Sequence, residues 1–437
     1  MSEQPASLPN GFRDSTGEAT LRPDLGPLPE DWQVVRLGEA VTLQRGISWA
    51  KRDESLDGTP VIAIPNIRDG SVNFNFQYRI KKKITPGKTI KANDILLVGS
   101  SGSIHNVGRA AIIPDNPFSQ LTFASFLVKV APSHNIDRWF LYFLLRSDMV
   151  TFAACSKRAA DGKFNLQIDE LRRHFIPLPP LPEQRAIAHV LTSIQRAIEA
   201  TERVIAAARE LKKSLMRHLF TYGPVPPAEA ESVPLQETEI GTLPVHWQVV
   251  RLGEVADIFD KQRIPLNEQQ RAKMKGIYPY CGANGIVDYI NDYIFDGEYV
   301  LLAEDGGYWG AYEPSSYLMR GKFWVNNHAH VLKGKSDICT NYFLHLVLNY
   351  LNISPLIGGD ARGKLTQAVA KRIPIPLPPL PEQQRIAEML AAVDEKIQAE
   401  EQRKAALQSL FRSMLHHLMT GKVRVGAQHH SAPTTEA

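Results

Sequence analysis

Two long stretches of the chain place apolar side chains at alternating steps of four and three residues. The first, residues 183–219, has apolar or small residues at Ile187, Leu191, Ile194, Ile198, Thr201, Ile205 and Ala208, followed in a shifted register by Leu211, Leu215 and Leu219. The second has Ile386, Leu390, Val393 and Ile397, then polar Glu400 and Lys404, then Leu407, Phe411, Met414 and Leu418. This spacing predicts two long helices, each with one narrow apolar seam.

The length of these helices indicates that they pair. A helix of about 37 residues is roughly 55 Å long, longer than a single domain needs. The two helices are therefore expected to pack on each other. If they pair antiparallel, a pseudo-two-fold axis relates the two halves and holds their other regions apart. The polar residues at the second seam predict looser pairing there, or a place for a partner.

Two motifs occur twice in the same order. Trp32-Gln-Val-Val-Arg-Leu-Gly-Glu39 is repeated identically at residues 247–254, and Ile176-Pro-Leu-Pro-Pro-Leu-Pro-Glu-Gln184 at residues 375–383. Each half thus has a Trp motif, a variable stretch, a proline motif and a long helix, which indicates two homologous halves in tandem. Proline followed by Glu suits a helix start. A polyproline ligand is the alternative, which the position before each helix disfavours.

The variable stretches contain short apolar runs such as residues 90–98 and 299–302, which predict strands. The expected fold class is α+β, with two tandem variable domains of mixed, curved β-sheet and few helices, separated by two long antiparallel coiled-coil helices. The expected divisions are a disordered tail (1–25), a first variable domain (26–155), a central region with its helix (156–221), a linker (222–244), a second variable domain (245–355), a C-terminal region with its helix (356–421) and a disordered tail (422–437).

Composition narrows the class. Hydrophobic residues make up 43% of the chain and charged residues 22%, without an apolar run of membrane-spanning length. The polar, proline-containing first thirty residues do not form a secretory signal, so a cytoplasmic location is expected. Cys155, Cys281 and Cys339 lack zinc-type spacing and are predicted to be packing residues. The net charge of +4 permits an anionic partner without demonstrating one.

Three basic segments are candidate phosphate contacts. The lysine cluster comprises Lys81, Lys82, Lys83, Lys88 and Lys91. Its alternative is a solvated strand edge. Residues 156–163 and 358–364 are basic loops before the two proline motifs, and each is either a DNA-phosphate contact or a solvated turn. The second loop matches Gly-x-x-x-x-Gly-Lys, but Leu365 stands where a nucleotide-binding loop needs Ser or Thr, so nucleotide binding ranks third.

Catalytic and metal motifs are not evident. His328 and His330 would face the same side of a strand, but no Cys, Asp or Glu lies at a recognisable metal-ligand spacing. Nuclease, nucleophile-elbow and methyltransferase cofactor patterns are also missing from the sequence. We therefore predict no catalytic residue, no metal site and no cofactor on this chain.

Glycine-rich loops with polar or aromatic tips are the best candidates for base contacts, because glycine allows close backbone approach and Asn or Arg suits base edges. The predicted DNA-binding residues are Arg45, Ser100, Ser101, His105, Asn106, Lys157, Arg158, Lys163, Tyr280, Asn284, Tyr308, Trp309, Asn326, Asn327, His328, Arg362 and Lys364.

The doubled Trp motifs, proline motifs and long helices together resemble the specificity subunit of Type I restriction-modification enzymes, over about residues 26–421. Residues 277–284 (Ile-Tyr-Pro-Tyr-Cys-Gly-Ala-Asn) and 326–331 (Asn-Asn-His-Ala-His-Val) resemble one type of target-recognition domain in that family. The resemblance implies a bipartite double-stranded DNA target, with the helices setting its spacer. Because the two variable domains differ, the target should be asymmetric.

The resemblance also implies partners: two modification subunits that use S-adenosylmethionine to methylate adenine, and restriction subunits that use ATP and Mg²⁺ to translocate and cleave. This chain would be a non-catalytic, cytoplasmic component of a phage-defence restriction system. One alternative is a scaffold of a methylation-only or other phage-defence complex. The enzyme alternative, a nuclease or nucleotide hydrolase using Asp360, Arg362 and Lys364, predicts ATP turnover that is lost on Lys364→Ala.

Overall fold

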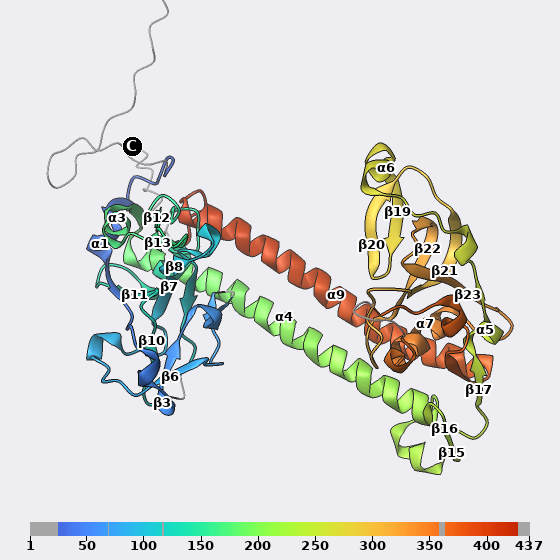
Figure 1. The fold of residues 1–437 in the computed structure, drawn as a ribbon. Helices are drawn as coiled ribbons and strands as arrows, with labels where there is room; N and C mark the ends of the chain where they lie inside the picture. The colour runs from blue at the N-terminus through green and yellow to red at the C-terminus, as the bar shows by residue number, and fades with distance from the viewer. Residues whose placement is uncertain (1–24, 69, 116–117, 358–362, 427–437) are drawn as a thin grey trace, which may run out of the picture. The chain divides into compact units, whose positions relative to one another are not determined.

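The computed structural model describes residues 25–68, 70–115, 118–357 and 363–426, and the chain divides into two compact units (Figure 1). Unit 1 comprises the residues up to Ala200 together with those from Lys404 onward, and unit 2 comprises Thr201–Arg403. Each unit contains a β-rich domain and one end of each long helix, α4 (Leu181–Tyr222) and α9 (Leu380–Met419). The predicted α+β class with two β-rich domains and two long helices is confirmed.

Unit 1 is built on a six-stranded sheet in the order β2-β11-β7-β9-β5-β4. The central strand β7 (Ile95–Val98) is apolar at every position because both of its faces are covered. Ile95 and Leu97 join the cluster that contains helix α2, whereas Leu96 and Val98 join a second cluster. The other strands are β2 (Val41–Arg45), β11 (Leu127–Pro132), β9 (Ala110–Ile112), β5 (Ser71–Val72) and β4 (Ile67–Arg68).

Two three-stranded sheets and three short helices complete this domain. One sheet has the order β10 (Thr122–Phe123), β3 (Glu54–Ile62), β6 (Tyr78–Ile80), and the other β12 (Ser156–Arg158), β13 (Phe164–Leu166), β8 (Ser100–Ser101). The helices are α1 (Leu37–Ala40), α2 (Arg138–Leu144) and α3 (Ile168–Arg173). Helix α2 begins where Asp137 accepts hydrogen bonds from two backbone N–H groups of its first turn.

Unit 2 contains a six-stranded sheet in the order β18-β23-β21-β22-β19-β20. The strands are β18 (Ala256–Ile258), β23 (Ala329–Gly334), β21 (Phe295–Ala303), β22 (Ser316–Val325), β19 (Lys275–Gly282) and β20 (Gly285–Ile290). Helix α7 (Asn341–Tyr350) is capped by Thr340 and buries Phe343 and Val347 in the core of the unit. The shorter helices are α5 (Leu252–Val255), α6 (Glu268–Lys273) and α8 (Gln367–Ala370).

The repeated motifs meet in space within each unit. In unit 1, β1 (Gln33–Arg36) of the Trp motif pairs antiparallel with β14 (Phe175–Leu178) of the proline motif. In unit 2, β17 (Gln248–Arg251) pairs with β24 (Pro374–Leu377) in the same register. In each motif the first proline lies in the strand and the last lies in the first turn of the long helix. These positions account for the prolines without a role as a polyproline ligand.

Each repeated Trp fastens the start of a long helix. Trp32 Nε1 donates to Glu183 at 2.9 Å, and Trp247 Nε1 donates to Glu382 at 2.9 Å. Both glutamates lie in the first turn of their helix, where the helix dipole stabilises a carboxylate. The same Trp–Glu contact therefore links the Trp motif to the first turn of the long helix in both halves.

The long helices pack antiparallel. In unit 1 the start of α4, with Ile187 and Leu191, shares a core with the end of α9, which includes Leu418. In unit 2 the end of α4, with Leu219, shares a core with Ile386 near the start of α9. The predicted pairing is confirmed. The polar seam residue Glu400 is 6% exposed and is paired with Lys396 at 2.6 Å on its own helix.

Two segments hold more structure than the sequence indicated. Residues 222–244, expected as a linker, contain the hairpin β15 (Leu235–Thr238) and β16 (Gly241–Pro244). Its Gln236 side chain donates to the carbonyl of Trp247 at 2.9 Å. Residues 422–426, expected in a tail, pack on unit 1 because Arg424 pairs with Asp31 and Glu183. Residues 1–24 and 427–437 lie outside the described residues.

Short 3-10 turns connect many of these elements. The 3-10 turns are η1 (Lys51–Asp53), η2 (Ile64–Asn66), η3 (Pro86–Lys88), η4 (Ile104–Asn106), η5 (Pro227–Ser232), η6 (Asp260–Gln262) and η7 (Ser354–Leu356). All three cysteines are buried and unbridged, in line with packing roles. Within the described ranges, none of the helices has both the length and the apolar composition to cross a bilayer.

Candidate nucleic-acid interface

A pocket of about 570 Å³ in unit 2 brings together four of the predicted DNA-binding residues, namely Tyr280, Asn284, Asn326 and His328. They come from the ends of β19 and β22, from the turn between β19 and β20, and from the residues just before β23. Glycine residues of the β19–β20 turn and Gly306 form part of its wall, which leaves backbone accessible to a ligand. The volume is in the usual range for ligand sites.

The four residues do not have equal roles. Tyr280 is 2% exposed, and its hydroxyl accepts a hydrogen bond from the backbone N–H of Leu266 at 2.8 Å. It therefore supports the pocket more than it offers a contact. Asn284 and His328 are exposed, whereas Asn326 is buried. His328 Nδ1 lies 2.7 Å from Asp305 Oδ1, a pocket residue that the sequence did not single out.

The loop after β21 carries two of the predicted aromatic contacts. Tyr308 is 54% exposed, as a base or sugar contact requires. Trp309 is half-buried against the core, and its Nε1 donates to the carbonyl of Ala303 at 3.2 Å. The structure thus favours Tyr308 over Trp309 as the contacting side chain. Asn327, between Asn326 and His328, is exposed.

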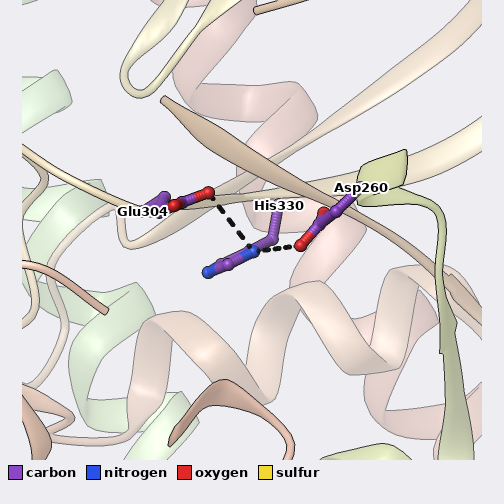
Figure 2. Close-up of side chains that lie close together, drawn as sticks. All are labelled: Asp260, Glu304 and His330. Atoms are coloured by element: carbon purple, nitrogen blue, oxygen red, sulfur yellow. Dashed lines mark hydrogen bonds and ion pairs between the residues drawn. The ribbon is translucent and has the colours of Figure 1, made fainter. Parts of the chain in front are cut away.

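Next to the pocket lies a buried cluster of Asp260, Glu304 and His330 (Figure 2). His330 Nδ1 is 2.7 Å from Asp260 Oδ2 and 3.7 Å from Glu304 Oε2. Three such groups within 4.8 Å of one another could hold a metal ion. Asp260 was not identifiable as a partner from the sequence, because it lies 70 positions from His330.

The neighbours of this cluster favour an ionic network over a metal centre. Arg263 Nη1 is 2.6 Å from Glu304 Oε2, and Lys364 Nζ is 3.1 Å from Glu304 Oε1. His330 Nε2 also lies 2.7 Å from the carbonyl oxygen of Leu365. The carboxylates and both imidazole nitrogens thus already have partners, and the carboxylate charges are already matched by two cationic side chains. The network fastens the segment around Leu365 to the sheet.

Both carboxylates in this network are held in the charged form. Burial raises the pKa of Asp260, but the hydrogen bond and charge of His330 and the charge of Arg263 outweigh it, so the pKa is lowered. Burial likewise raises the pKa of Glu304, and its hydrogen bonds with Arg263 and Lys364 lower it further than burial raises it. Each charge is therefore matched inside the protein.

The two histidines do not share one face of a strand, as their spacing would allow, because β23 begins at Ala329, after His328. His328 is an exposed pocket residue and His330 is fully buried in the network. Lys364 is half exposed in spite of its pairing with Glu304, whereas Arg362 and Asp360 lie outside the described residues.

In unit 1 the sheet β12-β13-β8 gathers most of the predicted residues. Lys157 and Arg158 lie on β12, Lys163 precedes β13, and Ser100 and Ser101 form β8. The three basic side chains are exposed, and Lys163 pairs with Asp161 at 3.1 Å. Arg158 lies over the ring of Phe164, 5.8 Å from its centroid. Residues from two distant parts of the sequence thus share one basic surface.

The remaining predicted residues of unit 1 have mixed environments. Arg45 donates to the carbonyl of Leu166 at 2.7 Å, so its guanidinium braces the β12–β13 sheet. His105 is exposed beside a pocket of about 350 Å³ that Arg109 and Arg146 also line. Asn106 accepts a 3.4 Å hydrogen bond from Arg109.

The lysine cluster divides in the same way. Lys88 and Lys82 donate to backbone carbonyls, and Lys81 pairs with Asp57 at 2.8 Å. Lys83 and Lys91 are exposed. Only part of this cluster is therefore available to phosphate.

The duplicated architecture and its polar surfaces define a two-domain recognition protein, and comparison with known proteins gives the family. Residues 29–209 and 244–409 match the family described as Type I restriction modification DNA specificity domain. The chain belongs to this family of specificity (S) subunits.

Similar sequences and solved structures point to the same family. The putative type I restriction enzyme MjaX specificity subunit of Methanocaldococcus jannaschii is 27% identical over 424 residues, which cover 92% of this chain and 96% of that one. A putative specificity subunit of Haemophilus influenzae, S.HindORF215P, is 43% identical over 150 residues, 34% of this chain and 37% of that one. The S subunit from M. genitalium shares the fold at 16% identity, with a TM-score of 0.60 over 91% of this chain and 99% of that one.

Proposed function

We propose that this chain reads a bipartite, asymmetric double-stranded DNA target, with one half-site for each β-rich domain. The observation that carries the proposal is that each unit gathers dispersed polar residues at one place, the pocket in unit 2 and the β12-β13-β8 sheet in unit 1. The two surfaces differ in residues and in shape. Two different half-sites, and hence a target without two-fold symmetry, follow from that difference.

The two surfaces suit different parts of DNA recognition. The exposed cations of β12 suit phosphate, which supplies affinity without sequence information. The amides of the unit 2 pocket suit base edges, which supply sequence discrimination. We further propose that the paired helices α4 and α9 set the spacer between the half-sites, as the family resemblance implies.

Catalysis in this proposal belongs to partner proteins. Two modification subunits would bring S-adenosylmethionine, and restriction subunits would bring ATP and Mg²⁺, in the cytoplasm. The solved complex of the type I R-M system that concerns complex assembly and conformational transition contains a chain with this fold, at 21% identity and a TM-score of 0.52. The ion-paired state of Lys364 and Glu304 also argues against a nucleotide-hydrolysing role for Lys364.

Single-molecule methylome sequencing of cells that express this chain with its neighbouring modification gene tests the proposal. The expected result is a new bipartite adenine-methylation motif with unequal halves, which disappears when this chain is omitted. A stable complex with the modification subunit that yields no new motif would contradict the recognition role. Cleavage of DNA in vitro that requires added restriction subunits would separate a restriction system from a methylation-only complex.

A further inference from the structure

Two asparagines in the unit 2 pocket offer opposite hydrogen-bonding groups. Asn326 Oδ1 accepts a hydrogen bond from the backbone N–H of His328 at 2.8 Å, so its Nδ2 is the group left for another partner. Asn284 Nδ2 donates to the carbonyl of Gly306 at 2.9 Å, so its Oδ1 is the group left over. Because a backbone N–H can only donate and a carbonyl can only accept, the orientation of both amides is fixed.

Asn326 differs from an exposed asparagine because most of its side chain is buried while its Nδ2 has no acceptor in the part of the protein that the structure describes. The residue is 93% buried, since 7% of it is exposed. Among the described residues, none accepts a hydrogen bond from its Nδ2. Nδ2 is not among the fully enclosed polar atoms that lack a partner, so it is open to the pocket and placed to meet an acceptor that enters there.

The pocket wall keeps access to this amide open. A Cβ on Gly282 would clash with Val287 at 2.8 Å and would lie against Asn326 Nδ2 at 3.4 Å, so a side chain there would narrow the approach to the donor. Gly285 and Gly306 both have positive φ, which L side chains rarely adopt. The glycines thus leave room for a planar group beside the two amides.

We propose that this pocket reads one adenine of the half-site bound by unit 2. Asn326 Nδ2 would donate to a ring nitrogen of the base, and Asn284 Oδ1 would accept from its 6-amino group. On the major-groove edge only adenine presents a nitrogen acceptor beside an amino donor, whereas guanine presents two acceptors, cytosine a donor, and thymine an acceptor and a methyl group. The inference rests on the proposed function, which does not specify the bases of the target, and it names one of them.

Two asparagines share here a task that one asparagine usually performs with both of its groups. The base could offer its major-groove edge in the duplex, where this pattern singles out adenine. It could also offer its Watson–Crick edge after leaving the stack, where cytosine too has a ring acceptor beside an amino group. Arg271 also lines the pocket: its guanidinium lies over the ring of Tyr280, 5.3 Å from the centroid, and pairs with Asp288 at 3.2 Å.

The test uses Asn326→Asp in the full chain with its modification partner. This variant keeps the oxygen that accepts from His328 and replaces only the free donor by an acceptor. The control for the added negative charge is Asn291→Asp. Asn291 is exposed, follows strand β20 of the β19–β20 hairpin and lies outside the pocket. Relative to this control, affinity for the wild-type target should fall about tenfold to a hundredfold. The methylome motif should lose its adenine requirement at one position of one half-site.

Base analogues distinguish the two edges. 7-Deazaadenine at that position should weaken binding of the wild type, but not of Asn326→Asp, if the major-groove edge is read. A 2-aminopurine next to that adenine should brighten on binding if the adenine leaves the stack. A half-site without adenine, equal losses on cognate and unrelated DNA, or insensitivity to both probes would overturn the inference. Failure to obtain any bipartite motif would instead refute the proposed function itself.

Discussion

At the scale of single residues, the environment decides which of two similar side chains can meet DNA. Tyr308 and Trp309 are neighbours in one glycine-rich loop, yet the first is exposed and the second packs against the core. His328 and His330 differ in the same way. Residue type therefore identifies candidates, and burial sorts them.

Substitution of the two loop aromatics should separate binding from stability. Tyr308→Ala should weaken binding to one half-site by about 1 to 3 kcal/mol, the range for lost base stacking, and leave the melting temperature unchanged. Trp309→Ala should destabilise unit 2 by about 2 kcal/mol, because packing and a hydrogen bond to Ala303 are lost. Fluorescence anisotropy and thermal melts measure the two effects. A Tyr308→Ala variant that melts early would contradict its assignment as a surface contact.

The stability of the protein should depend on pH through the protonation of His345 in α7. Burial lowers the pKa of His345 from its ordinary value near 6.5 to about 4. As pH falls below 6.5 the unfolded chain takes up a proton that the folded chain does not, so stability is lost down to about pH 4. The loss at pH 5 is about 2 kcal/mol.

Thermal melts of the wild type and His345→Gln between pH 7 and pH 5 measure this dependence. The variant should start less stable, because it loses the 3.0 Å contact with Ser316, but should lose less stability on acidification. His134→Gln, which alters an exposed histidine of unit 1, is the control and should follow the wild type. Parallel curves for the wild type and His345→Gln would refute the assignment.

At the scale of elements, the pairing of short strands brings together candidate residues that are far apart in the sequence. The pairing of β8 with β13 brings Ser100 and Ser101 beside the basic hairpin β12–β13. The pairings of β1 with β14 and of β17 with β24 bring the repeated motifs together. Such pairings connect residues more than sixty positions apart, so periodicity along the chain cannot reveal them.

The hairpin β12–β13 should contribute affinity without specificity. Lys157→Ala and Arg158→Ala should each weaken cognate and unrelated DNA alike, and each should reduce the slope of log K against log salt by about 1. Titrations at several salt concentrations measure this slope. Arg173→Ala, an exposed cation on α3 that pairs with Glu170, is the control and should leave the slope unchanged. A loss confined to cognate DNA would assign the hairpin to base recognition instead.

The segment after α9 should stabilise unit 1. Arg424 pairs with Glu183, which is 4% exposed, and with Asp31 at 2.7 Å. These contacts raise the pKa of Arg424 and keep it charged. Arg424→Ala would leave the carboxylate of Glu183 buried with only Trp32 as a partner, at a cost of about 2 kcal/mol. Denaturant melts should show this loss, whereas Arg412→Ala on the exposed face of α9 should show none.

At the scale of the whole molecule, duplication and divergence act together. Both units use the same strand pair and the same Trp–Glu contact to join sheet and helix. Their six-stranded sheets share the order of the first four strands, but the hairpin at the far edge is attached by a different strand. Among the described residues, the two three-stranded sheets occur in unit 1, so the domains present different surfaces. A shared scaffold with two different recognition surfaces is what an asymmetric target requires.

Variants in the two units should therefore act independently. Arg158 and Tyr308 lie in different units, so the binding free-energy changes of Arg158→Ala and Tyr308→Ala should add to within about 0.5 kcal/mol in the double variant. Base substitutions in one half-site should change the effect of Tyr308→Ala and leave that of Arg158→Ala the same. Strong non-additivity in anisotropy titrations would show that the two recognition surfaces are coupled.

The sequence by itself determined the doubled organisation, the two long helices and their antiparallel pairing, and the fold class. Those features rest on local periodicity and on identical repeated motifs, which are readable along one dimension. It also identified Asn284, Asn326 and His328 as candidates from loop composition, although their contacts with DNA are still predictions.

Only the tertiary structure decided which candidates lie together and which of their atoms are free. The pocket joins strand ends and turns from separate parts of unit 2, and the buried network joins Asp260, Glu304 and His330 across long stretches of chain. Folding also uses one side of each amide of Asn284 and Asn326 internally, which leaves a defined donor and a defined acceptor. Hydrogen-bond partners depend on three-dimensional neighbours, and for that reason the sequence could name these residues but not their chemistry.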